Sequence, residues 1–132
     1  MKDVEGFFAE NGLLMVGGYV DFLCSFNGGR PDPCLLNFDG RCISVQFFYA
    51  LESPMESCTL KFAVGFYEGR VPSGFLPIAH DSEGGLLVLD CRENKRGQVF
   101  YWDHSTESDV PNVSSLKLVC ADFYALEKLF DQ

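Results

Sequence analysis

The segment from Phe75 to Ser105 constrains the fold more than any other part of the chain. It contains three runs of residues that are typical of β-strands, separated by two short polar loops that contain glycine. The runs are Phe75–His80, Leu86–Asp90 and Gln98–Asp103, and the loops span residues 81–85 and 91–97. Because short loops join strands that run in opposite directions, this segment predicts a three-stranded antiparallel meander.

Helical patterns lie on both sides of the meander. Lys2–Glu10 and about Gly18–Phe26 carry apolar side chains at helical spacing, and each is followed by Asn-Gly, a pair that suits the left-handed end of a helix. Asp122–Asp131 shows the same spacing near the C-terminus. Pro54–Glu68 is also predicted to contain a helix, although its apolar residues follow no single period, and the proline at position 72 ends it.

Two further strands are predicted before the meander and one after it. Cys34–Phe38 and Arg41–Val45 flank Asp39-Gly40, a pair typical of a two-residue hairpin turn, and Leu116–Val119 is the last strand. The whole pattern predicts an α+β fold, in which one domain over residues 1–132 has a mixed, mainly antiparallel sheet of about six strands with flanking helices. We expect the helices to bury five residues in particular: Phe7, Phe22, Leu23, Phe123 and Leu126.

The composition agrees with one hydrophobic core. The chain has 132 residues, of which 47% are hydrophobic and 14% aromatic, so it can bury roughly two-thirds of its unfolded surface. It contains no apolar run of about eighteen or more residues, and acids stand near its N-terminus where a signal peptide would be basic. We therefore expect a cytoplasmic protein.

The charge balance limits the class of partner. The formal net charge is −9, whereas nucleic acids and anionic membranes both require a basic surface, so neither is expected as a direct partner. A basic protein is the natural complement of such a chain. Acidity also serves solubility alone in many proteins, so the charge by itself favours a basic partner only modestly.

The six cysteines do not have the spacing of a metal site. No Cys-x-x-Cys pair occurs, and a protein without a secretion signal keeps most of its thiols reduced in the cytosol. Cys24, Cys34, Cys58 and Cys120 have apolar neighbours and are predicted to be small buried side chains. A reactive Cys91 near a histidine is conceivable, but an inert cysteine is the interpretation that we favour.

The residues with the greatest potential for chemistry stand at the ends of neighbouring predicted strands. His80-Asp81 and Asp103-His104 would offer a divalent metal two imidazoles and two carboxylates if all four converged. Side chains alternate between the faces of a sheet, so at most one residue of each pair points to a shared site. We favour the alternative that Asp81 accepts backbone hydrogen bonds in the turn that follows it. Sequence motifs of nucleophilic and metal hydrolases are absent, and no catalytic residue, metal or cofactor is predicted.

Trp102 is the only tryptophan, and two roles are open for it. Phe100 and Trp102 share one face of the predicted strand, and Val99 and Tyr101 share the other. Trp102 is therefore either an anchor of the core, which is the favoured interpretation, or an exposed aromatic side chain among acids. In the second case it would be a suitable contact for a partner protein.

Three blocks of sequence resemble the SUKH superfamily. Tyr19–Pro31 is similar to the early helix of that family, which closes on Asn-Gly-Gly, and Ala121–Leu129 is similar to its closing helix. Between them, Pro77–His104 contains Pro-Ile-Ala-x-Asp, then Gly-Gly before an apolar strand, and then Val-Phe-Tyr-Trp-Asp-His. The blocks together cover nearly the whole chain in the family's order. Met15–Gly18 departs from the usual Leu-Pro before the second helix, and Gly85 stands where asparagine is common, so local turn geometry is in question at both places.

The resemblance implies a function and a kind of partner. The superfamily consists mostly of bacterial immunity proteins, with fungal cell-wall regulators and some viral proteins as relatives. The resemblance implies a non-catalytic protein that binds and neutralises a cognate toxin, often a nuclease with a basic groove. The alternative is a regulatory or scaffold domain that does not neutralise a toxin. We expect the partner-binding residues on loops and strand ends of the meander and just after it. They are Glu83, Trp102, Asp103, His104, Glu107 and Asp109.

Overall fold

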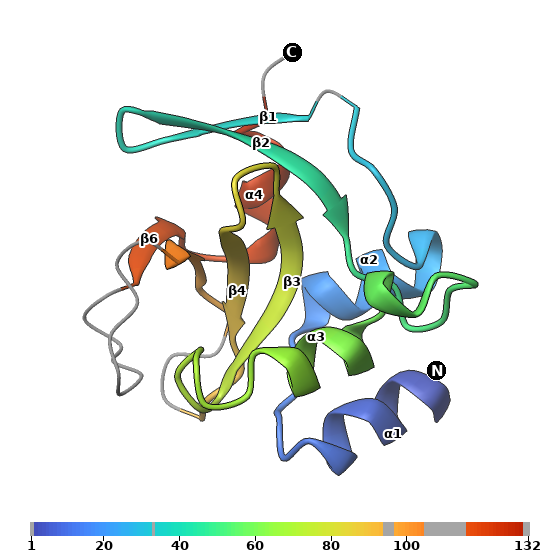
Figure 1. Cartoon of the computed structure of the whole chain (residues 1–132). Helices are drawn as coiled ribbons and strands as arrows, with labels where there is room; N and C mark the ends of the chain where they lie inside the picture. Colours follow the sequence, from blue (N-terminus) through green and yellow to red (C-terminus); the bar gives the residue numbers. More distant parts are fainter. Residues whose placement is uncertain (1, 33, 94–96, 105–115, 131–132) are drawn as a thin grey trace.

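The strands pair in the order in which they occur in the chain, and every pairing is antiparallel (Figure 1). The computed structural model describes residues 2–32, 34–93, 97–104 and 116–130, and six strands and four α-helices lie within these ranges. The α+β fold with a six-stranded sheet is therefore confirmed.

The predicted meander forms the centre of the sheet. It consists of β3 (Phe75–Asp81), β4 (Leu86–Asp90) and β5 (Val99–Trp102), whose bounds differ from the predicted ones by one residue at most. All five residues of β4 are buried. A strand that is covered on both faces has no need of alternating polar residues, which explains why its sequence is the continuous run Leu-Leu-Val-Leu-Asp.

The predicted hairpin is also present. β1 (Leu35–Phe38) and β2 (Arg41–Phe48) are joined by Asp39 and Gly40, whose φ angles of 48° and 72° both lie in the left-handed region. β2 is three residues longer than predicted, because it continues past an irregularity between Val45 and Phe47 to pair with β3. Such bulges bend a strand and increase its twist.

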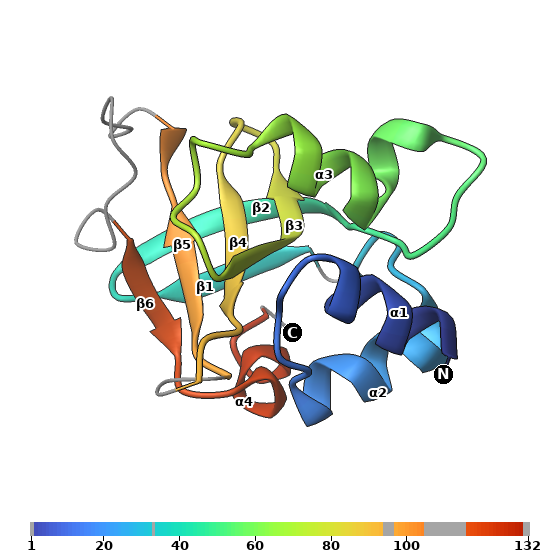
Figure 2. The same ribbon diagram turned by 90° about the horizontal axis from the view of Figure 1, so that it is seen from below.

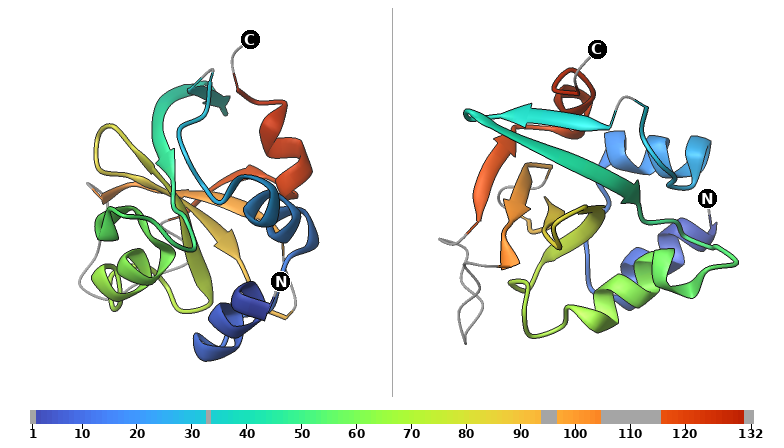
Figure 3. Two further views of the ribbon diagram at one scale, coloured as in Figure 1. Left: turned by 90° about the vertical axis from the view of Figure 1, so that its right-hand side faces the viewer. Right: turned by 45° about the horizontal axis from the view of Figure 1, so that its top comes forward.

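The sheet is strongly curved, and its first hairpin arches over the ends of the central strands (Figures 1 and 3). Similar register irregularities occur in the pairings of β3 with β4 and of β5 with β6 (Lys117–Cys120). The curvature brings β1 back towards β5, so that the rings of Phe38 and Tyr101 lie 5.8 Å apart. The loop ends of the hairpin and of the meander therefore meet on one side of the molecule.

The helices cover both faces of the sheet. α1 (Lys2–Glu10) has its predicted bounds, and α2 (Gly17–Phe26) begins one residue earlier than predicted. α3 (Leu60–Phe66) lies on one side of the strands, whereas α2 and α4 (Phe123–Glu127) lie on the other (Figure 3). α2 and α4 also run next to each other, as Figure 2 shows from below.

Two helical predictions were too long. Within Pro54–Glu68 the chain forms only a short 3₁₀ turn, η1 (Glu56–Cys58), before Thr59 accepts a hydrogen bond from the backbone N–H of Phe62 and starts α3. α4 starts where Asp122 accepts from the N–H of Ala125 and ends at Glu127, although a helix had been predicted as far as Asp131, which lies outside the described residues.

The core contains the predicted helical stripes, shifted in places by one neighbouring residue. Leu23 and Leu126 are buried as predicted, whereas Phe7, Phe22 and Phe123 are only partly buried against the core. Phe8 and Tyr19 occupy the fully buried positions instead. The prediction for cysteines was wrong at Cys24, which is exposed, and too strong at three others, which are only half-buried: Cys34, Cys58 and Cys120.

Candidate functional site

The predicted partner-binding residues fall into three groups in the structure. Glu83, in the turn between β3 and β4, and His104, just after β5, are exposed, and Asp103 is half-buried beside His104. Glu107 and Asp109 lie outside the described residues. Trp102 has only 2% of its surface exposed and is discussed below.

Asp81 fixes the turn that carries Glu83. Its Oδ1 accepts hydrogen bonds from the backbone N–H groups of Glu83 (2.9 Å) and Gly85 (2.7 Å), which confirms the predicted turn-capping role. Its Oδ2 accepts a third bond, of 2.6 Å, from the hydroxyl of Tyr101 on β5. Asp81 is buried, and its bonds to Gly85 and Tyr101 are shielded from water, whereas the bond to Glu83 is only partly buried. Together the three bonds tie the turn between β3 and β4 to the neighbouring strand.

Gly85 explains one of the two departures from the family pattern. A Cβ atom at this position would collide with the hydroxyl and ring of Tyr101, closer than real Cβ contacts ever come. An asparagine here would therefore displace the phenol from Asp81. The hydrogen bond between Tyr101 and Asp81 therefore requires glycine at position 85.

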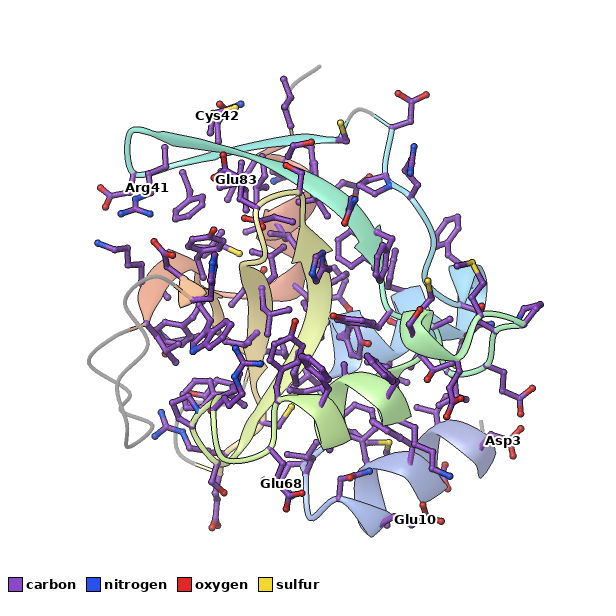
Figure 4. The ribbon with its side chains drawn as sticks, viewed as in Figure 1. Asp3, Glu10, Arg41, Cys42, Glu68 and Glu83 are labelled. Carbon is purple, nitrogen blue, oxygen red and sulfur yellow. The ribbon has the colours of Figure 1, made fainter. Side chains whose placement is uncertain are left out.

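Three of the predicted partner-binding residues, Glu83, Asp103 and His104, line one hollow of about 290 Å³. It lies between the β1–β2 hairpin and the ends of β3 and β5, and Figure 4 shows Arg41 and Cys42 on the hairpin near Glu83. We call it the hairpin hollow. It is lined by Arg41, Cys42, Ile43, Glu83, Tyr101, Asp103 and His104.

His104 is held against the same turn. Its imidazole lies over Gly84, where an added Cβ would come within 3.3 Å of the ring, so the glycine permits this close approach. His104 is nevertheless exposed to solvent. Glu83 and His104 are thus placed beside each other by two glycines in the turn and by the end of β5.

The charges around the hollow act on Tyr101. Burial raises the pKa of its phenol above the ordinary value, and the hydrogen bond to Asp81 and the negative charges of Asp81, Asp103 and Glu83 raise it further. The phenol therefore stays protonated and remains a donor to Asp81 at neutral pH. Arg41 is the one basic side chain among the residues that line the hollow, which otherwise presents carboxylates and an imidazole.

His80 does not join this site. Its ring stacks on Phe47, with centroids 5.5 Å apart, and its Nδ1 lies 3.0 Å from Oε1 of Gln46. Asp81, the next residue, bonds to Tyr101 and to the turn. The side chains of His80 and Asp81 therefore contact different residues, because neighbouring side chains alternate between the faces of a strand. Among the described residues, no group of three or more histidine, cysteine, aspartate or glutamate side chains is close enough to hold a metal ion.

Trp102 occupies the core, which confirms the first of its two predicted roles. Its ring makes an edge contact with Tyr67 at 5.6 Å, and the guanidinium of Arg70 lies 5.5 Å from its centroid. The side chain is covered by the segment that follows α3. It therefore offers no contact surface, and its inclusion among the partner-binding residues was wrong.

Sequence reasoning missed the part of the hollow that comes from the hairpin. Arg41 and Ile43 belong to a strand that is far from the meander in sequence, and only the curvature of the sheet brings them to it. The Asp-Gly turn predicted the hairpin but not the direction in which it folds over. Tyr101 was treated as a member of a strand face, and nothing in its local sequence indicates a bond to Asp81.

By its fold, the protein is an α+β domain that presents charged loop residues from a curved antiparallel sheet. It belongs to the SMI1 / KNR4 family (SUKH-1), whose model matches residues 17–126. The match includes two of the three resembling blocks in full and most of the third. The family includes immunity proteins and is generally non-catalytic, with immunity or regulatory roles.

Comparisons with curated proteins and with solved structures give no significant match. In the part of the chain that the structure describes, no helix is both long and apolar enough to cross a membrane.

Proposed function

We propose that this protein is a non-catalytic immunity protein that binds and neutralises a cognate bacterial toxin domain with a basic surface, such as a nuclease. The observation that carries the proposal is the convergence of Glu83, Asp103 and His104 on the hairpin hollow. Membership of a family that includes immunity proteins supports it. The hollow would form part of the toxin-binding surface.

The physical basis is a fixed, negatively charged set of loop residues on an acidic protein. Bonds from Asp81 hold the Glu83 turn in place, so little conformational entropy is lost when a partner binds there. A nuclease must present lysine and arginine side chains to phosphate groups, and the net charge of −9 attracts such a surface over several ångströms. Electrostatic attraction of this kind speeds association more than it raises final affinity.

Co-expression with the cognate toxin tests the proposal. The test variant is Glu83→Lys with Asp103→Lys, and the matched control is Glu10→Lys with Glu68→Lys, which makes the same change in net charge. Figure 4 shows Glu10 and Glu68 towards the opposite end of the molecule from Glu83. We expect cells that express the control to survive and cells that express the test variant to die.

Two further measurements make the result decisive. Circular dichroism and thermal unfolding of the test variant must show an intact fold, and Glu83→Lys alone provides a milder change because Glu83 is exposed. Equal survival with both double variants would place the toxin interface elsewhere. Failure of the unmodified protein to protect cells from a toxin encoded beside it would favour the regulatory alternative instead.

A further inference from the structure

A second hollow, of about 530 Å³, lies between α2 and α4 and shares no residue with the hairpin hollow. Its volume is within the range of about 300–1,000 Å³ that is usual for ligand sites. Its apolar lining consists largely of aromatic rings, and we call it the aromatic groove. These rings belong to Phe22, Phe26, Phe48, Phe123, Tyr124 and Phe130.

The rim of the groove exposes two large aromatic side chains. Phe26, the last residue of α2, has 71% of its surface exposed, and Tyr124 on α4 has 65% exposed. Single exposed apolar residues are common, but Phe26 belongs to an aromatic cluster in which Phe22 contacts Phe26 at 5.6 Å and Phe123 at 5.2 Å, and Tyr124 lines the same groove. A patch of this kind indicates an interaction surface.

The walls of the groove are fixed in place. The turn after α2 is tied to β2, because the N–H of Gly29 donates to Phe48 O (3.1 Å) and the N–H of Phe48 donates to Gly29 O (2.7 Å). A Cβ at Gly28 would lie only 2.7 Å from the same Phe48 carbonyl oxygen, so the approach requires glycine. Asn27 adds an anchor by accepting from the N–H of Leu51 at 2.8 Å.

The other wall is set by Gly18 and Tyr124. The ring of Tyr124 lies over Gly18 of α2, where an added Cβ would be 3.0 Å from it. The tyrosine hydroxyl donates to Asp21 Oδ2 at 3.4 Å. Gly18, which ends the Met15–Gly18 departure from the usual Leu-Pro, thus allows α4 to pack closely against α2.

The charge of the groove is negative. Three exposed carboxylates line it, from Asp21, Asp32 and Glu127, against one guanidinium, from Arg30. Carboxylates beside aromatic faces attract cationic side chains, because the faces of the rings are also electronegative. The surface therefore complements an apolar residue with lysine or arginine next to it.

We propose that the aromatic groove is a docking site for a segment of a partner protein in which an apolar side chain is flanked by arginine or lysine. The apolar side chain packs on the rings of Phe22 and Phe123, and the flanking cations face Asp21 and Glu127. A second copy of this chain is a poor occupant, because two copies of this groove would bring like charges together. The site is independent of toxin neutralisation at the hairpin hollow.

The test uses two peptides of opposite charge and the full chain. Acetyl-Arg-Leu-Arg-amide is the probe and acetyl-Glu-Leu-Glu-amide its control, and each is titrated while the backbone amides are followed by NMR. We expect saturable shifts at Phe26, Gly29 and Tyr124 with the arginine peptide alone. Equal shifts with both peptides, or shifts confined to other parts of the chain, would overturn the proposal.

Matched variants separate the groove from general charge effects. Asp21→Asn with Glu127→Gln removes two carboxylates at the groove, and Asp3→Asn with Glu10→Gln removes two exposed carboxylates on α1. We expect the first pair to weaken binding of the arginine peptide about five- to tenfold and the second to change it less than twofold. Equal weakening by both pairs would contradict a site in the groove.

A change at the rim tests the apolar part. Phe26→Ala should weaken the arginine peptide, whereas Phe66→Ala, at an exposed phenylalanine that does not line the groove, should not. Because Phe26 is exposed, its loss leaves the fold intact, and the NMR spectrum checks this directly. Dimerisation of the unmodified chain that is abolished by Phe26→Ala would assign the groove to self-association and refute the proposal.

Discussion

The bond between Asp81 and Tyr101 can be measured by a double-mutant cycle. The variants are Asp81→Ala, Tyr101→Phe and the combination, and the quantity is the free energy of unfolding. Tyr101→Phe removes one hydroxyl that donates to a buried carboxylate, and such bonds contribute about 1.5–3 kcal/mol. Asp81→Ala removes the acceptor of three donors at once.

The cost of Asp81→Ala should exceed that of an ordinary turn cap. A buried donor without an acceptor costs about 1–3 kcal/mol, and the hydroxyl of Tyr101 is buried, whereas water can reach the exposed N–H of Glu83. We therefore expect a loss of about 3–5 kcal/mol. The double variant has no Tyr101 hydroxyl that could be left without an acceptor. Its loss in free energy of unfolding should therefore be smaller than the sum of the losses of the two single variants by about 1–3 kcal/mol.

Urea unfolding followed by tryptophan fluorescence is the appropriate assay. Trp102 is the only tryptophan, it is buried, and it follows Tyr101 on β5, so its emission reports the loss of this part of the sheet. Circular dichroism should give the same midpoint if unfolding is two-state. Additivity of the two single losses within about 0.5 kcal/mol, or a loss below about 1 kcal/mol for Asp81→Ala, would refute the reasoning.

Three further outcomes are expected. Burial raises the pKa of Tyr19, Tyr49 and Tyr101 above the value near 10 that tyrosine has in the unfolded chain. The unfolded chain therefore loses these protons at a lower pH than the folded one, so the free energy of unfolding should fall as pH rises above about 10. The expected slope is at most about 1.4 kcal/mol per pH unit for each tyrosine. Alkaline urea titrations measure this slope, and Tyr101→Phe should reduce it. Burial, together with the charge of Asp122, raises the pKa of the Cys120 thiol to about 11. Cys120 should therefore react with a disulfide reagent at pH 8 far more slowly than Cys24, which is exposed. Mass spectrometry of the labelled peptides measures the two rates. Association with a basic toxin should slow markedly between low and physiological salt while dissociation changes little, and a salt-independent association rate in stopped-flow measurements would contradict a role for surface charge.

The sequence predicts local structure well where turns and strands determine it together. The Asp39-Gly40 turn and the meander rest on residues that are close in sequence. The turn was found where it was predicted, and the strands of the meander lie within one residue of their predicted bounds. Pro54–Glu68 was predicted less accurately, because an irregular segment and a short helix follow one another there and their apolar residues form no single stripe.

The candidate site could be predicted only in part. Glu83 and His104 were found from the rule that strand ends and loops carry recognition, and they do lie together. Arg41 could not be placed beside them, because the curvature that brings it there arises from bulges that no local pattern shows. Similarly, the helical spacing of α2 does not show where the covered surface ends, and Phe26, the last residue of the helix, is left exposed.

The strictly sequential order of the strands has a consequence for how this surface can change during evolution. Because each strand pairs with its nearest neighbours in the chain, lengthening the turn at Asp39-Gly40 alters the closure entropy of one hairpin and leaves the order of the other pairings unchanged. Each doubling of such a loop costs only about 0.6 kcal/mol. Insertions at this turn can therefore accumulate without disturbing the order of the strands, so one scaffold can acquire a new recognition loop in small steps.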